Sequence, residues 1–165
     1  SEKYIQTQAA KDKIVLITGA NTGIGKETAK ALVEKGANVL ITGRSEDRLH
    51  KAKLYCNAET IEFDIADFDN IPKFAKECLS ILENRVDVLI NNAGIGVRSS
   101  IEELNIDDFL KVFNVNVFGL SGPSSLILPS KASRIISSDS SYFLWPCNAK
   151  LKLFKIVKTL LSSIP

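Results

Sequence analysis

The chain has 165 residues, of which 45% are hydrophobic and 24% are charged, and its net charge at pH 7 is +2. This composition is typical of one globular domain with a buried core, and so small a charge does not support a nucleic-acid partner. No apolar run reaches the ~18 residues that a membrane span requires. The sequence contains no methionine, so we expect Ser1 to be an internal or processed start and residues 1–165 to form a single domain.

The three cysteines, Cys56, Cys78 and Cys147, lie far apart in the sequence. They form no Cys-x-x-Cys pair, and no cluster of histidines accompanies them. This spacing favours buried or incidental thiols in a reducing compartment over a disulfide or a metal site. We therefore expect no bound metal.

Predicted strands and helices alternate through the first 90 residues. Apolar runs predict strands, and amphipathic stretches with suitable capping residues predict the helices between them. The expected strands are 13–18, 39–41, 60–64 and 86–90, and the expected helices run from the glycine-rich turn to about residue 36, over 45–55 and over 71–82. This alternation, with its short connections, is typical of an α/β fold in which helices cover both faces of a doubly wound, Rossmann-like parallel sheet.

The pattern is less regular after residue 94. We expect a helix over 102–118 that buries Leu104, Phe109, Val112, Phe113 and Phe118. The pair Gly122–Pro123 should break or kink that helix. A fifth strand is expected at 134–136, and a basic amphipathic helix at 149–164.

The turn after the first strand contains three glycines before a helix begins. Glycine allows a sharp turn and the close approach of an anion, and the free N–H groups of a helix start point toward that anion. The stretch therefore predicts a phosphate-binding turn, although an ordinary tight strand-to-helix turn remains the alternative. Its residues include Thr18, Gly19, Asn21, Thr22, Gly23, Ile24 and Gly25.

Arg44 follows the second predicted strand. In a dinucleotide-binding fold, an acid at the end of this strand binds the ribose 2′-hydroxyl, whereas a nearby arginine pairs with a 2′-phosphate. Gly43 stands where the acid would be, and the planar arginine fork matches phosphate well. We therefore predict NADP rather than NAD, with a solvated arginine at a helix start as the alternative.

The tetrapeptide Asn91-Asn92-Ala93-Gly94 follows the fourth predicted strand. Ligands of open parallel sheets lie over the carboxyl ends of the strands, where the strand order reverses. The first and fourth strands would be neighbours at that point. We therefore expect this tetrapeptide to lie beside the glycine-rich turn.

These two motifs make the chain resemble the short-chain dehydrogenase/reductase family over about residues 13–136. The sequence Thr-Gly-Ala-Asn-Thr-Gly-Ile-Gly-Lys-Glu-Thr-Ala is especially similar to the same motif in the retinol-dehydrogenase-like branch of that family. The resemblance implies a set of roles for single residues. Asp64 and Ile65 would contact the adenine, Asn91, Ala93 and Gly94 would belong to the cofactor site near the riboses, and Asn116 would order a water in a proton relay. A helix asparagine that is bonded to backbone is the alternative for Asn116.

The family's chemistry uses a serine together with a Tyr-x-x-x-Lys pair, and this sequence contains no such pair. The resemblance makes Lys150 the family's lysine, which puts Pro146 at the tyrosine position. Tyr142 is the nearest other tyrosine. Ser140 matches the catalytic serine, with Ser138 as its alternative. The family's last strands would follow Pro165, so we expect a sheet of about five strands.

The resemblance thus implies an NADP-dependent oxidoreductase that transfers hydride between nicotinamide and a small alcohol or carbonyl substrate. The first alternative is an NADP-binding module or fragment without catalysis, since Pro146 cannot donate a proton. The second is an interaction protein that uses the basic helix at 149–164. We expect a cytoplasmic protein, or one on the cytosolic face of an intracellular membrane if an anchor precedes Ser1. A homo-oligomer and contact with a membrane are both compatible with the sequence.

Overall fold

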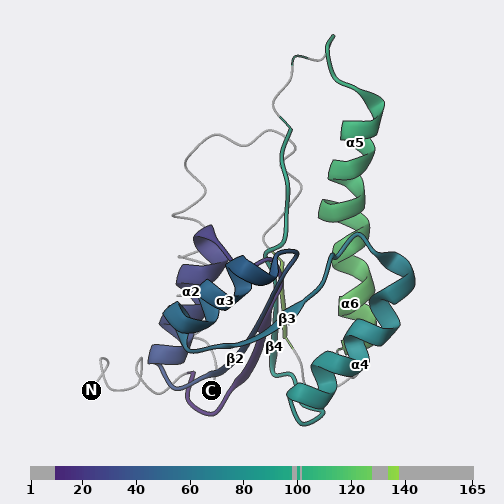
Figure 1. Cartoon of the computed structure of the whole chain (residues 1–165). Coiled ribbons are helices and arrows are strands. Elements are labelled where there is room, and N and C mark those ends of the chain that lie inside the picture. The colour runs from purple at the N-terminus through teal and green to yellow at the C-terminus, as the bar shows by residue number, and fades with distance from the viewer. Residues whose placement is uncertain (1–9, 98–99, 101, 128–133, 138–165) are drawn as a thin grey trace.

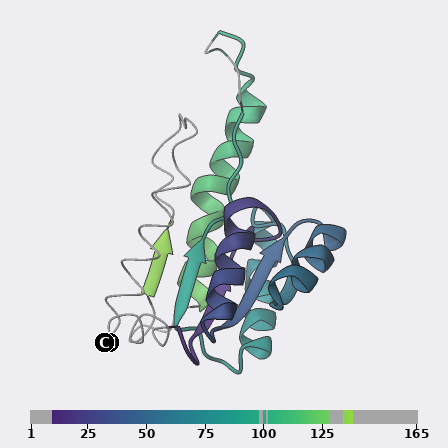
Figure 2. The same cartoon turned by 90° about the vertical axis from the view of Figure 1, so that its left-hand side faces the viewer.

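The computed structural model describes residues 10–97, 100, 102–127 and 134–137. Five strands form one parallel sheet in the order β3-β2-β1-β4-β5. All the strand arrows point the same way in Figure 2, with β5 in yellow-green beside β4 in teal. The bounds are β1 Ile14–Ile17, β2 Asn38–Gly43, β3 Glu59–Glu62, β4 Val88–Asn91 and β5 Arg134–Ser137.

Helices cover both faces of this sheet, as the alternating sequence predicts (Figure 1). Helices α2 (Gly23–Glu34) and α3 (Glu46–Cys56) pack on one face. Helices α4 (Ile71–Ile81) and α6 (Gly119–Ile127) pack on the other, and a short 3₁₀ turn, η1 (Phe68–Asn70), leads into α4. Helix α5 (Ile106–Phe113) continues through the π-helical turn η2 (Asn114–Phe118) into α6.

The central strand β1 is buried on both sides. Val15 and Ile17 contact the α2–α3 layer, whereas Ile14 and Leu16 contact the α4–α6 layer, because successive strand side chains point to opposite faces. Each fully buried aliphatic side chain contributes roughly 1.5–3 kcal/mol to folding. Because both faces of β1 are buried, four apolar residues in succession form a strand here.

The strand order reverses between β1 and β4. From β1 the chain runs outward to β2 and β3 and then returns to β4 on the other side of β1. The carboxyl ends of β1 and β4 therefore meet at the switch point, where open α/β sheets bind their ligands. The predicted fold class and the predicted contact between the two motifs are both present.

The segment after β4 differs from the prediction in three ways. Helix α5 starts at Ile106, later than expected, because the side chain of Asn105 caps it by accepting a hydrogen bond from the Asp107 N–H at 2.8 Å. Leu104 and Phe118 were predicted to be buried, but they are 38% and 56% exposed. Leu104 precedes the helix, and Phe118 ends the π-helical turn, which rotates the following face.

Of the break or kink predicted at Gly122–Pro123, the break is absent, since α6 continues through Pro123. A proline inside a helix removes one backbone hydrogen bond. Pro123 is fully buried, and packing of α6 against α4 outweighs that loss. The fifth strand is present where it was expected, but the helix predicted at 149–164 lies outside the described residues.

Candidate cofactor site

The glycine-rich turn leaves β1 and packs tightly against the end of β4. Gly19 has a φ of +63°, and a Cβ atom at this position would lie 2.6 Å from the Cα of Ala93. A Cβ at Gly25 would lie 2.8 Å from the Cα of Ala20, so the first turn of α2 also approaches the backbone closely. Both positions therefore require glycine.

A small hydrogen-bond network fixes this turn to β4. The Oγ1 of Thr18 accepts from the N–H groups of Asn92 and Ala93, each at 3.1 Å. The Nδ2 of Asn92 donates to the carbonyls of Thr18 and Gly19, each at 3.0 Å. Thr18 is only 1% exposed, so these bonds form in a dry environment where each contributes strongly.

The N-terminus of α2 faces the opening between the two strands. Thr22 occupies the N-cap position in an extended conformation, but among the described atoms its side chain makes no capping hydrogen bond. The first N–H groups of a helix have no partner within the helix and favour an anion. The turn is therefore suited to a phosphate group, as the sequence predicts.

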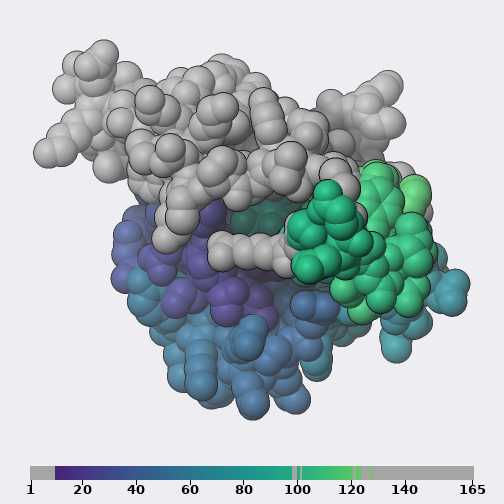
Figure 3. Space-filling model, turned by 90° about the horizontal axis from the view of Figure 1, so that it is seen from above, coloured from purple at the N-terminus to yellow at the C-terminus, as the bar shows by residue number. Residues whose placement is uncertain are grey.

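A cleft of about 660 Å³ lies at this edge of the sheet. Figure 3 looks down on this edge, with the purple and blue surface of the N-terminal segments on the left and below and the green surface of residues 102–127 on the right. Most of the predicted cofactor residues line the cleft. They are Gly19, Asn21, Thr22, Ile24, Gly25, Arg44, Asp64, Ile65, Ala93 and Gly94.

Three predicted cofactor residues do not line this cleft. Thr18 and Asn91 are 1% and 2% exposed and lie beneath it, where they shape the strand ends. Gly23 has a φ of +58° and nothing within 4 Å of an added Cβ, so its role is in the path of the turn.

Arg44 stands at the mouth of the cleft, directly after β2. Its Nη1 lies 3.9 Å from Oδ2 of Asp64, and the two side chains are 62% and 45% exposed, so this pair contributes little to stability. The other carboxylate oxygen of Asp64 accepts from the Ala66 N–H at 3.0 Å, which fixes the chain after β3. Gly43 lies against Asn21, and a Cβ at Gly43 would be 2.5 Å from the Asn21 Cγ.

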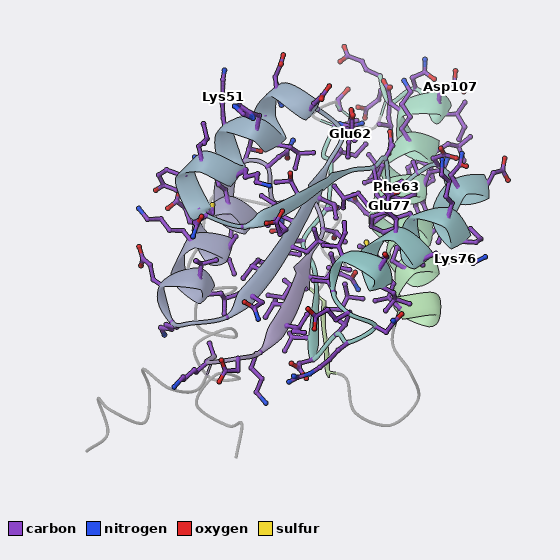
Figure 4. All side chains as sticks on the ribbon, turned by 60° about the horizontal axis from the view of Figure 1, so that its bottom comes forward. Lys51, Glu62, Phe63, Lys76, Glu77 and Asp107 are labelled. Carbon is purple, nitrogen blue, oxygen red and sulfur yellow. The ribbon has the colours of Figure 1, made fainter. Side chains whose placement is uncertain are left out.

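Sequence reasoning missed several residues that line the cleft: Thr42, Ser45, Arg48, Phe63, Ile95 and Val115. Phe63 stacks on Phe74 of α4, with ring centroids 4.0 Å apart, and Figure 4 shows it beside this helix. Arg48 could have been found, because helical spacing places it one turn after the N-cap, Ser45.

Asn116 lies in the π-helical turn η2 and contacts the loop after β4. Its Oδ1 accepts from the Ile95 N–H at 2.9 Å, and its Nδ2 donates to the Ile95 carbonyl at 2.8 Å. Both contacts are with the backbone of the loop after β4, and the expected proton-relay role of Asn116 stays a prediction. Single-turn π-helices are frequent at functional sites.

The predicted catalytic residues Ser140, Tyr142 and Lys150 lie outside the described residues, as does Pro146. The structure therefore places none of them relative to the cleft. Within the described ranges, no helix is long and apolar enough to cross a membrane, and no group of histidine, cysteine and acidic side chains could hold a metal.

The fold and the anion-binding turn at the strand switch point define a dinucleotide-binding α/β protein. The model of the short chain dehydrogenase family matches residues 13–143 of this sequence. The chain therefore belongs to the short-chain dehydrogenase family.

Comparisons with individual proteins agree with this assignment. Dehydrogenase/reductase SDR family protein 7-like of Drosophila melanogaster is 34% identical over 131 residues, which cover 74% of this chain and 40% of the relative. A short chain dehydrogenase of Shigella flexneri in complex with NADP is 26% identical, with a TM-score of 0.73, over 79% of this chain and 60% of that one. A 3-ketoacyl-(acyl-carrier-protein) reductase of Brucella melitensis in complex with NADH is 30% identical, with a TM-score of 0.68, over 72% and 50%.

This chain spans less than half the length of the curated relatives that it matches. The matched residues 13–143 span both strand-end motifs and the positions that line the cleft. The family match ends at residue 143, seven residues before Lys150.

Proposed function

We propose that this chain is the cofactor-binding part of an NADP-dependent oxidoreductase that acts on an alcohol or carbonyl compound. The observation that carries the proposal is Arg44, which lines the cleft beside the glycine-rich turn, at the end of a strand that closes with Gly43 instead of an acid. An arginine here pairs with a 2′-phosphate. Solved neighbours include one complex with NADP and one with NADH, so the choice depends on this chain's own residues.

The described residues fit a dinucleotide. The uncapped start of α2, with the close contacts at Gly19 and Gly25, leaves room and N–H donors for the diphosphate. Asp64 and Ile65 would border the adenine, and Ala93 and Gly94, which follow β4, would border a ribose. When bound, the cofactor would donate a hydride to a carbonyl carbon as NADPH, or accept one from an alcohol carbon as NADP⁺.

Asn116 would act on the reaction through the loop after β4. Its two hydrogen bonds to Ile95 hold this loop against η2, and Ile95 lines the cleft. In this proposal, Tyr142 would exchange a proton with the substrate oxygen, and Ser140 would stabilise that oxygen. Lys150 would lie near the cofactor ribose. A homo-oligomer in the cytoplasm, with a small-molecule substrate, completes this proposal.

The alternative proposal is an NADP-binding module that does not catalyse a reaction. The resemblance puts Pro146 at the tyrosine position, and a proline side chain cannot donate a proton. Loss of general acid catalysis alone typically reduces a rate by ~10²–10⁴-fold. The retinol-dehydrogenase-like sequence of the glycine motif does not decide between the active oxidoreductase and the non-catalytic module.

Two measurements separate these proposals. Titration of the protein with NADPH and NADH, followed by nucleotide fluorescence, should show saturable binding with a clear preference for NADPH. Absorbance at 340 nm with a panel of alcohols and ketones then tests turnover. Binding without turnover on any compound supports the module, and the absence of saturable binding would rule out both.

Arg44→Ala is the matched test of the 2′-phosphate assignment. It should weaken NADPH binding by about tenfold or more and leave NADH binding within twofold, because only NADPH carries the 2′-phosphate on its adenine ribose. Equal losses for the two nucleotides would contradict the assignment.

A further inference from the structure

We propose that Arg48 is a second specificity-determining residue, which together with Arg44 selects a 2′-phosphorylated nucleotide. This inference rests on the proposed NADP dependence. It adds a residue on α3, whereas Arg44 was identified from its position at the end of β2. Arg48 lies on α3, and its side chain lines the same cleft as Arg44 and Ser45.

In the protein without nucleotide, the positive charge of Arg44 is partly neutralised by Asp64. Its guanidinium lies 3.9 Å from the carboxylate of Asp64, so the two together carry no net charge. A phosphate monoester carries about −1.5 to −2 charges at pH 7. Arg44 alone, beside Asp64, is a poor match for such a group.

Arg48 supplies the missing positive charge. Among the ion pairs of the described residues, none involves Arg48, and its side chain is exposed at the cleft. Its backbone N–H donates to the Ser45 Oγ at 3.4 Å, so the N-cap fixes the turn that carries it. A guanidinium in this position can pair with phosphate through its planar fork.

Helix α3 separates its charges between two surfaces. Its first-turn acids, Glu46 and Asp47, line a different groove, which runs along the edge strand β3. Lys51 lines that second groove as well, and Figure 4 shows it projecting outward from α3. The first-turn acids of the helix therefore line the groove beside β3, whereas Arg48 lines the cofactor cleft.

The experiment compares NADPH and NADH binding, by nucleotide fluorescence, in the full chain and in single variants. Arg48→Ala should weaken NADPH by about tenfold and change NADH by less than twofold. Arg48→Lys should recover part of the loss, because lysine keeps the charge but not the fork. Lys51→Ala is the matched control: it removes one positive charge from the same helix on the other groove, and both affinities should stay within twofold.

Raised salt gives a second readout, since exposed ion pairs are screened. The NADPH preference of the natural chain should decrease more steeply with salt than that of Arg48→Ala. Arg48 has no such role if Arg48→Ala binds NADPH within twofold of the natural chain while Arg44→Ala loses its preference. The proposed NADP dependence itself fails if the natural chain does not prefer NADPH. Thermal unfolding of each variant confirms that the exposed substitutions leave the fold intact.

Discussion

The carboxamide of Asn116 binds both backbone polar groups of Ile95, with an N–H···Oδ1 distance of 2.9 Å and an Nδ2···O distance of 2.8 Å. One side chain thus joins the π-helical turn η2 to the loop after β4. Both residues lie near the cleft, since Ile95 lines it and an added Cβ at Gly94 would be 3.5 Å from the Asn116 Oδ1. This contact fixes the loop that borders the proposed ribose site.

Asn116→Asp should destabilise the protein by about 1–3 kcal/mol. The carboxylate can still accept from the Ile95 N–H, but it cannot donate to the carbonyl and would repel it. Urea unfolding measures the change. Asn114→Asp, in the same π-helical turn, is the control and should have a smaller effect; equal losses would show that the contact with Ile95 is not the cause.

Thr18→Val should cost about 2 kcal/mol or more of unfolding free energy, because it leaves the buried N–H groups of Asn92 and Ala93 without their acceptor. Valine has nearly the same shape as threonine, so no cavity is expected. Thr18→Ser keeps the oxygen and should retain most of the stability. If both variants lose the same amount in urea unfolding, the methyl group and not the hydroxyl is responsible.

Gly43→Asp should not convert the site to NADH. The new Cβ would lie 2.5 Å from the Asn21 Cγ, so the asparagine must move into the cleft that it lines. We expect NADPH binding to weaken by about tenfold with no gain for NADH.

The double variant Asn21→Gly/Gly43→Asp removes the whole Asn21 side chain, including the Cβ that would lie 2.9 Å from an added Cβ at position 43. It should gain affinity for NADH, through a carboxylate that can accept from the ribose 2′-hydroxyl. Fluorescence titrations with both nucleotides measure the two variants. Tight NADH binding by Gly43→Asp alone would show that Asn21 does not block the position.

Burial raises the pKa of the Cys78 thiol to about 12 from an ordinary value of 9.0, with a smaller contribution from the Glu77 carboxylate. Because the folded pKa lies above the unfolded one, this thiol stabilises the fold fully below pH 9, and the contribution is lost as the pH rises toward 12. Unfolding free energy should therefore fall over this window, and it should fall less steeply in Cys78→Ala. Identical slopes would contradict the assignment.

Cys78 should also resist thiol reagents at pH 8 until the protein unfolds, since the thiolate is the reactive form. Cys56 belongs to the α2–α3 layer, and Cys78 to the α4 layer on the opposite face of the sheet. The sheet therefore separates these two thiols.

Much of the fold follows from the sequence because its signals are local. The apolar run at Ile14–Ile17 and the N-cap Ser45 each determine one element, and the strand-to-helix order then determines a parallel sheet. The predicted cofactor residues of the glycine turn came from the same local pattern, and most of them line the cleft.

The missed features depend on contacts between distant segments. Phe63 reaches the cleft because it stacks on Phe74, and Pro123 is tolerated because α6 is buried against α4. The exposure of Phe118 results from the π-helical turn, which changes the helical face by part of a turn. No periodicity in the sequence indicates such an insertion.

The glycine turn is attached to the strand at the middle of the sheet. β1 pairs with β2 on one side and with β4 on the other, and Leu16 and Ile17 are fully buried. The backbone amides of β1 should be among the slowest to exchange with deuterated solvent, because they become accessible only when the sheet separates. Because the glycine turn is attached to this strand, its N–H donors would already hold their bound positions when a nucleotide arrives. Little conformational entropy would then be lost on binding.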